Sequence, residues 1–244
     1  MRMLGRLLRR SLLIQGAWNY QGMQHLGFLW ALLPALRDLP PERRREALAR
    51  AAGFYNAHPY FGGYLLGAVA RLESEGQGEA AARLKKAALT PLGASGDRLF
   101  WAGLRPLSGL AALLALLLLV AGPLEHGDAP AWEWGLALSG LATMAYNVVH
   151  LYWRRRALHD GHRLGLGLSA ALKELGGLPL TRHASLGLAA LAGLALPLSV
   201  GLGTEASAEA AGWLAAAALL GWQLPARGWA LPALLLLLVA IHLV

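Results

Sequence analysis

Long stretches after residue 106 contain no Asp, Glu, Lys or Arg. They cover residues 107–124, 134–153, 184–202 and 228–244, and a shorter one covers residues 210–224. About 20 apolar residues in a helix cross the hydrocarbon core of a bilayer. With 56% hydrophobic and only 15% charged residues, the chain carries more apolar side chains than a soluble core requires. The sequence therefore predicts an all-α integral membrane protein with about four to five transmembrane helices.

The charged residues between these stretches predict how the chain is oriented. One loop is basic and contains Arg154, Arg155, Arg156, Arg163, Lys173 and Arg182. The neighbouring loops contain the acidic residues Glu125, Asp128, Glu205 and Glu209. Because Lys and Arg accumulate in cytoplasmic loops, we expect the basic loop and the N-terminus in the cytoplasm. The net charge of +8 does not indicate a nucleic-acid partner, since the basic residues lie between apolar stretches and do not interleave with aromatic ones.

The first 70 residues follow a different pattern. Residues 1–13 place arginines on one helical face and leucines on the other, which predicts an amphipathic helix at the membrane interface. Residues 15–34 and 54–69 are apolar but interrupted by Gly, Pro and amide side chains, which predicts re-entrant or buried half-helices. Between them, Pro40 and Pro41 open a polar helix. We therefore divide the chain into a membrane-associated region (1–70), a charged cytoplasmic connector (71–90) and a transmembrane region (91–244).

Three short motifs place polar groups and glycines among apolar residues. They are residues 15–24 (QGAWNYQGMQ), 54–60 (FYNAHPY) and 91–101 (PLGASGDRLFW). In this order they resemble the enzyme IID subunit of the mannose-fructose-sorbose family of the phosphotransferase system. The likeness continues through residues 104–106 and 146–149 and covers most of the chain.

The resemblance implies a subunit of the bacterial inner membrane that pairs with a IIC subunit in a hetero-oligomer. The pair would form the path of a hexose or amino sugar, which a IIB protein phosphorylates, while IIA and IIB carry the phosphoryl group. This chain would carry none and would not be an enzyme by itself. The residues agree with that expectation, because they show no cysteine, no P-loop, no paired carboxylates and no metal-ligand spacing. We predict no cofactor and no metal.

The candidate residues that face the sugar or the IIC subunit come from the three motifs. They are Trp18, Asn19, Gln24, Asn56, His58, Asp97, Arg98 and Trp101. Amide groups beside an aromatic ring suit a carbohydrate, but Trp18 could equally mark the headgroup level of the membrane. Asn56 and His58 could instead satisfy an irregular buried backbone. Asp97, which follows Ser95 and Gly96, could be the N-cap of the first long helix.

The motifs also depart from the family pattern at polar positions. Gln21 and Gly22 stand where the family usually has Glu-Arg, Ala57 replaces a threonine, and Arg98 replaces a small hydroxyl residue. These changes leave a second hypothesis open, in which the chain is a diverged membrane scaffold or regulatory subunit without transport activity.

Overall fold

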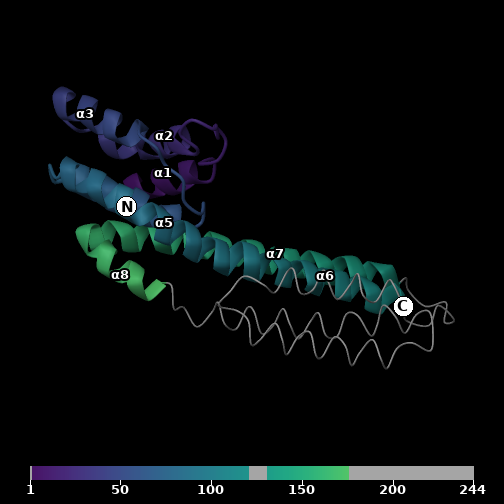
Figure 1. The fold of residues 1–244 in the computed structure, drawn as a ribbon. Helices are drawn as coiled ribbons and strands as arrows, with labels where there is room; N and C mark the ends of the chain where they lie inside the picture. The colour runs from purple at the N-terminus through teal and green to yellow at the C-terminus, as the bar shows by residue number, and fades with distance from the viewer. Residues whose placement is uncertain (1, 121–130, 176–244) are drawn as a thin grey trace. The chain divides into compact units, whose positions relative to one another are not determined.

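The computed structural model describes residues 2–120 and 131–175, and this part of the chain is helical (Figure 1). The α-helices are α1 (Arg2–Ser11), α2 (His25–Leu36), α3 (Pro41–Ala52), α4 (Gly62–Ser74), α5 (Gly78–Gly96), α6 (Arg105–Val120), α7 (Ala131–Leu164) and α8 (Leu168–Leu175). A π-helical segment, η1 (Asp97–Leu104), joins α5 to α6, and a short 3-10 helix, η2 (Gly165–Gly167), precedes α8. The predicted all-α class is confirmed for the described residues.

No helix within residues 2–120 and 131–175 is both long enough and apolar enough to cross a membrane. The predicted stretches 184–202, 210–224 and 228–244 lie outside the described residues, as do the last residues of the stretch 107–124. The stretch 134–153 forms part of α7. The number of transmembrane helices stays a prediction.

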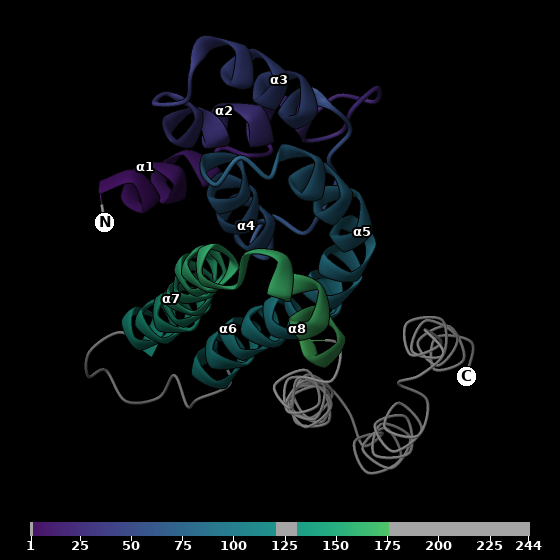
Figure 2. The same ribbon diagram turned by 90° about the vertical axis from the view of Figure 1, so that its left-hand side faces the viewer.

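The described residues belong to two compact units. The first contains residues 2–100 and 148–175, and the second contains residues 101–120 and 131–147. In the first unit, α2 packs against α1, α3 and α4, and α5 lies beside α4 and α8 (Figure 2). The division of the chain into three regions, with boundaries at residues 70 and 90, stays a prediction. Residues 71–90 form the end of α4, a turn at Gly76 with φ of 80°, and the first part of α5.

Helices α1 and α3 form where the sequence predicts them. In α1, Leu7 is fully buried while Arg2, Arg6 and Arg9 are exposed, so the amphipathic pattern matches the burial. Helix α3 begins at Pro41, whose missing N–H would have no partner in the first turn of a helix. Both helices therefore follow from local sequence signals.

The crossing of α4 and α7 depends on glycines. A Cβ atom on Gly67 would overlap the carbonyl oxygen of Leu158, and one on Gly161 would overlap the carbonyl oxygen of Tyr64. A Cβ on Gly63 would lie 2.9 Å from the backbone nitrogen of Leu158. Small residues let two helix backbones approach closely, as they do in packed membrane helices. This crossing fixes the second half of α7 against the core of the first unit.

In the second unit, two serines join α6 to α7. Ser108 Oγ donates to the carbonyl oxygen of Ala142, and Ser139 Oγ donates to that of Ala112, each at 2.9 Å. The two bonds run in opposite directions between the helices. Hydroxyl bonds of this kind stabilise helix pairs in an apolar environment.

Candidate functional site

The first two motifs are joined through their backbones. Asn19 and Met23 exchange two backbone hydrogen bonds, at 3.1 and 2.9 Å, around a turn in which Met23 has a φ of 58°. The N–H of Gln24 then donates to the carbonyl of Tyr55 at 2.8 Å, and the N–H of Tyr55 donates to that of Gly22 at 3.3 Å. The segments 19–24 and 52–56, which we call the joined loops, therefore form one structural element.

Side chains complete the joined loops. Asn19 Oδ1 accepts from the N–H of Gly22 at 2.9 Å, and its Nδ2 lies 3.1 Å from Nε2 of His25. Nδ1 of His25 lies 2.7 Å from the carbonyl oxygen of Ala52. Because an amide nitrogen only donates and a carbonyl only accepts, His25 is the tautomer with its proton on Nδ1. One imidazole thus connects the two loops.

Gln24 is the buried polar group of the joined loops, with 4% of its surface exposed. Its Nε2 donates to Oδ1 of Asn56 at 3.4 Å. Its Oε1 has no hydrogen-bond partner among the described residues. A buried acceptor in a folded protein normally has a donor, so this oxygen can take a hydrogen bond from a hydroxyl group or a water.

A cluster of rings continues from the joined loops and surrounds His58. His58 is 2% exposed and stacks on Phe100, with ring centroids 5.1 Å apart and planes at 12°. Tyr60 stacks on His150 with centroids 4.4 Å apart, and the guanidinium of Arg154 lies 4.8 Å from the Tyr60 ring. Burial and the charge of Arg154 lower the pKa of His58 to about 3, so the imidazole is neutral near pH 7.

The third motif contacts His58 through Phe100 and through Gly96. A Cβ on Gly96 would overlap the side chain of His58, so the close packing of the second and third motifs requires glycine there. The following side chains of Asp97 and Arg98 are exposed, and Trp101 is 45% exposed. The interpretation of Asp97 as an N-cap is wrong. Asp97 has helical dihedral angles of −60° and −44° and continues α5 into η1 without a break.

Trp18 lies on the surface with 46% of its area exposed, and its ring meets Tyr20 edge to face with centroids 4.8 Å apart. Other large apolar side chains of the first unit that lie in the joined loops, or close to them along the chain, are also exposed. They are Leu12, Leu13, Tyr20, Leu26, Trp30, Leu33 and Phe54. A contiguous surface of such side chains is typical of a contact with lipid or another subunit.

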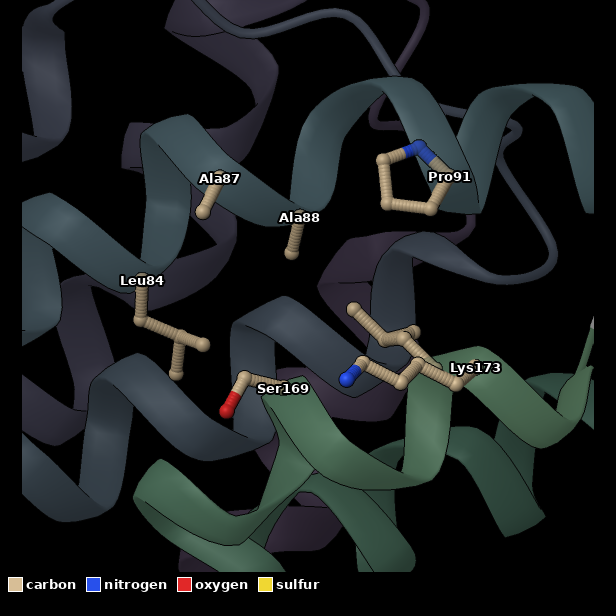
Figure 3. A pocket seen from close by; sticks show the side chains of 7 residues that line it. Leu84, Ala87, Ala88, Pro91, Ser169 and Lys173 are labelled. Atoms are coloured by element: carbon tan, nitrogen blue, oxygen red, sulfur yellow. The ribbon is translucent and has the colours of Figure 1, made fainter.

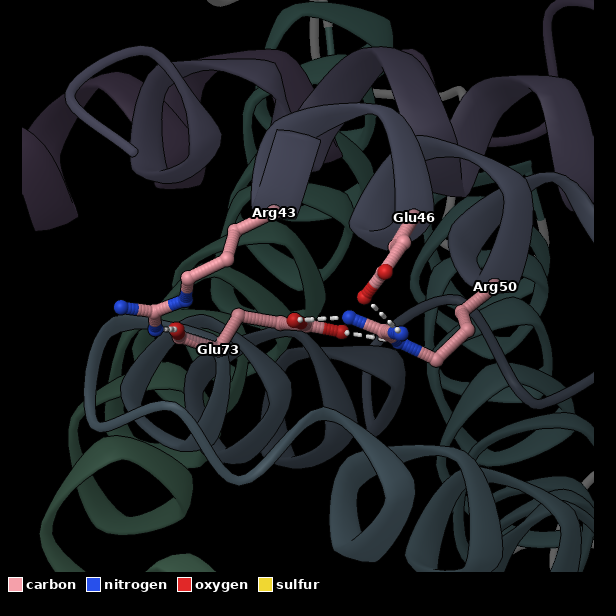
Figure 4. A network of polar contacts seen from close by, with 4 residues as sticks. All are labelled: Arg43, Glu46, Arg50 and Glu73. Atoms are coloured by element: carbon pink, nitrogen blue, oxygen red, sulfur yellow. Dashed lines mark hydrogen bonds and ion pairs between the residues drawn. The ribbon is translucent and has the colours of Figure 1, made fainter. Parts of the chain in front are cut away.

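Charged side chains join α3 to α4 and α5. Arg50 donates two hydrogen bonds to Glu73, at 2.8 and 3.0 Å, and Arg43 donates to the backbone oxygen of Glu73 at 2.7 Å (Figure 4). Glu73 is only 3% exposed, so this carboxylate needs its partners. The hydrogen bonds from Arg50 to Glu73 raise the pKa of Arg50.

Lys85 caps the C-terminal end of α3, which lies just before the second motif. Its ammonium donates to the carbonyl oxygens of Arg50, Ala51 and Gly53, at 3.2, 2.9 and 2.8 Å. It also lies 5.1 Å from the centroid of the Phe28 ring. The N–H of Gly53 also donates to the Arg50 carbonyl, at 3.4 Å. The last carbonyls of a helix lack donors from a following turn, and a cation is favourable at this end of a helix. Burial lowers the pKa of Lys85 to about 8.

Comparisons with known proteins agree with this arrangement of motifs. Residues 2–126, just over half of the chain, match the sequence profile of EIID-AGA, the PTS system mannose/fructose/sorbose family IID component. The chain belongs to this family. The match includes all three motifs, so the resemblance inferred from the sequence is confirmed.

Individual relatives carry the same family name. The chain is 32% identical over 178 residues to the PTS system mannose-specific EIID component of Escherichia coli (strain K12), which covers 69% of this chain and 56% of the relative. It is 34% identical over 124 residues to the fructose permease IID component of Bacillus subtilis (strain 168), which covers 47% and 45%. The IID chain thus spans about half the length of the curated relatives it matches.

Two solved structures resemble the IID chain. One is a cryo-EM structure of the mannose transporter ManYZ in complex with microcin E492, with a TM-score of 0.56, 26% identity, and coverage of 80% of this chain and 70% of that one. The other is described as a membrane protein, with a TM-score of 0.59, 29% identity, and coverage of 76% and 66%. The fold of the described residues is therefore similar to that of two solved membrane proteins, one of them from a mannose transporter complex.

The structure brings some of the predicted site residues together and separates others. Asn19, Gln24 and Asn56 meet in the joined loops, and His58 lies in the adjoining ring cluster. Trp18, Asp97, Arg98 and Trp101 are exposed instead. Sequence reasoning did not assign roles to His25, Tyr60, Phe100, His150 and Arg154. Tyr60 and Phe100 lie inside the quoted motifs, so their place in those motifs was the available signal.

Proposed function

We propose that this IID chain is the membrane subunit of a sugar phosphotransferase permease. With a IIC subunit it forms the path of a hexose or amino sugar, which a IIB protein phosphorylates. The proposal rests on the joined loops, where segments 19–24 and 52–56 present the buried acceptor Gln24 Oε1. A hydroxyl-rich ligand, or a water bound beside it, supplies the donor that this oxygen needs.

The same proposal places the chain in the bacterial inner membrane with its N-terminus in the cytoplasm. The chain carries no phosphoryl group. The phosphoryl carriers IIA and IIB are indirect partners of this chain within the complex. Residues 15–34 and 54–69 are re-entrant, and about four to five transmembrane helices surround them. Irregular backbone at membrane depth is stable only where protein or water covers it, so a IIC partner belongs against this region.

The predicted site residues divide into two roles. Gln24 and His58 are buried and hold the polar interior near the path, and Asn19 and the exposed Asn56 surround them in the joined loops. Trp18, Asp97, Arg98 and Trp101 are exposed and face the IIC subunit, in the same way that large aromatic and arginine side chains anchor other interfaces. Leu13 and Tyr20 are further exposed apolar side chains of the first unit.

The test is phosphoenolpyruvate-dependent sugar uptake in membrane vesicles. Deleting the gene should abolish uptake, and Gln24→Ala should reduce it at least several-fold while the protein level stays unchanged. Gln21→Ala is the matched control, because Gln21 lies in the same loop with an exposed side chain. Full uptake by the deletion strain would refute the proposal.

The second candidate is a membrane scaffold or regulatory subunit without transport activity. The departures at Gln21, Gly22, Ala57 and Arg98 motivate it, because they replace polar or charged groups of the family pattern. Purification in mild detergent separates the two candidates. The transporter requires a IIC companion in fixed stoichiometry and sugar uptake that depends on it, whereas the scaffold requires neither.

A further inference from the structure

A hollow between α5 and α8 lies away from the joined loops and has no role in the function proposed above. Its volume is about 210 Å³. The walls are mainly apolar, and all lining residues belong to the first unit (Figure 3). Leu84, Ala87, Ala88 and Pro91 of α5 form one side, and Ser169, Leu172 and Lys173 of α8 form the other.

The composition of the walls decides what can fill this hollow. The volume is several times the roughly 30 Å³ that a water molecule occupies in the liquid, and bound water needs two to four polar partners. Only Ser169 and Lys173 offer polar side-chain groups, and the Ser169 hydroxyl already donates to the carbonyl of Leu166 at 3.0 Å. Water therefore fits this hollow poorly, and a flexible apolar chain fits it well.

The charge beside the hollow indicates what the apolar chain is attached to. Lys173 reaches from α8 toward the space below Ala88 and Pro91, and its side chain is exposed (Figure 3). Among the described residues, no carboxylate forms an ion pair with Lys173. Helix α8 also lies in the basic segment 154–182, whose lysine and arginine residues favour the cytoplasmic face of a membrane. Anionic lipids of that face attract such residues.

We propose that this hollow binds an anionic phospholipid of the cytoplasmic leaflet. One acyl chain lies between α5 and α8 against Leu84, Ala88 and Leu172, and the lipid phosphate pairs with the ammonium of Lys173. The lipid thereby fills a space between two helices that protein side chains leave open. This inference depends on the membrane location of the chain and does not depend on its transport of sugar.

Native mass spectrometry of the full chain, purified from membranes in mild detergent with any co-purifying subunit, tests the proposal. The probes are phosphatidylglycerol and phosphatidylcholine with identical acyl chains, added at equal concentration. Wild-type protein should retain phosphatidylglycerol at least fivefold more than phosphatidylcholine. Lys173→Glu should remove this preference, and Ala87→Phe, which fills the hollow from its exposed edge, should reduce retention of both lipids.

Lys86→Glu is the matched control, because Lys86 is an exposed lysine of α5 that does not line the hollow. It should bind lipid like the wild type. Equal retention of both lipids by the wild type, or unchanged retention by both the Lys173 and the Ala87 variants, would overturn the proposal. Vesicle uptake of sugar is measured separately, so a failure here is distinguishable from a failure of the proposed transport function.

Discussion

The α4–α7 crossing and the joined loops hold the first unit together by opposite means. At the crossing, Gly67 and Gly161 contribute no side chain, and the two backbones touch. In the joined loops, Asn19, Gln24 and the adjacent His25 of α2 contribute side-chain hydrogen bonds that irregular backbone cannot make by itself. Substitutions that add atoms at the crossing should therefore destabilise the protein. In the joined loops, substitutions that remove side-chain atoms should do so.

The largest effect should come from the ion pair between Arg50 of α3 and Glu73 of α4. Arg50→Met leaves the carboxylate of Glu73 buried without its charged partner, and it should lower the free energy of unfolding by about 3–5 kcal/mol. Thermal unfolding in detergent measures the loss. The double variant Arg50→Met/Glu73→Leu removes both charges and should recover a large part of the stability. A double variant no more stable than the single one would contradict this explanation.

The next effect tests the crossing. Gly161→Ala places a methyl group against the backbone oxygen of Tyr64 and should destabilise the protein by about 2–3 kcal/mol. Gly93→Ala is the control, since nothing lies within 4 Å of a Cβ there and alanine favours a helix by up to about 1 kcal/mol. Equal melting temperatures for the two variants would show that the crossing tolerates side chains.

A smaller effect is expected within the joined loops. Asn19→Ala removes the bonds to Gly22 and His25 and should cost about 1–2 kcal/mol. Gln21→Ala, an exposed position in the same turn, should change stability by less than about 0.5 kcal/mol. Denaturant unfolding of the two variants compares their stabilities. Similar unfolding midpoints would show that the side-chain hydrogen bonds of Asn19 do not stabilise the joined loops.

A further effect concerns the pH dependence of stability and Lys85. Burial lowers the pKa of Lys85 from its ordinary 10.5 to about 8, so between these values the unfolded chain binds a proton that the folded chain does not. Stability should therefore rise with pH from about 8 and level off above 10.5. The rise should be absent in Lys85→Met. If the free energy of unfolding changes with pH in the same way for the wild type and Lys85→Met, the lowered pKa of Lys85 is not the cause of the rise.

The sequence predicted those parts of the fold that depend on neighbouring residues. The arginine and leucine faces of α1 and the proline at the start of α3 are local signals, and both helices begin within a residue or two of the expected positions. The error at Asp97 has a local cause as well. Ser95, Gly96 and Asp97 form a typical helix start, but the chain continues from α5 by widening its turns into η1.

The candidate site could be predicted only in part, because its contacts join distant segments. Motif content identified Asn19, Gln24, Asn56 and His58, but no spacing rule places Gln24 beside Asn56, 32 residues away. Lys85 reaches the carbonyls at the end of α3 and of Gly53 across 32 to 35 residues, and its position in the charged connector gave no signal for this contact. Gly161 gave no signal at all, because the requirement for glycine arises only when α4 packs against it.

The bond from Arg154 Nη1 to the carbonyl oxygen of Ser11, 2.7 Å long, has a consequence for how the chain is made. It links residues separated by 143 positions. At a synthesis rate of about 5–20 residues per second, the ribosome adds the arginine roughly 7–30 seconds after the serine. During that interval the end of α1 lacks this hydrogen bond. The first helix is therefore fully stabilised only after the later part of the chain has been synthesised.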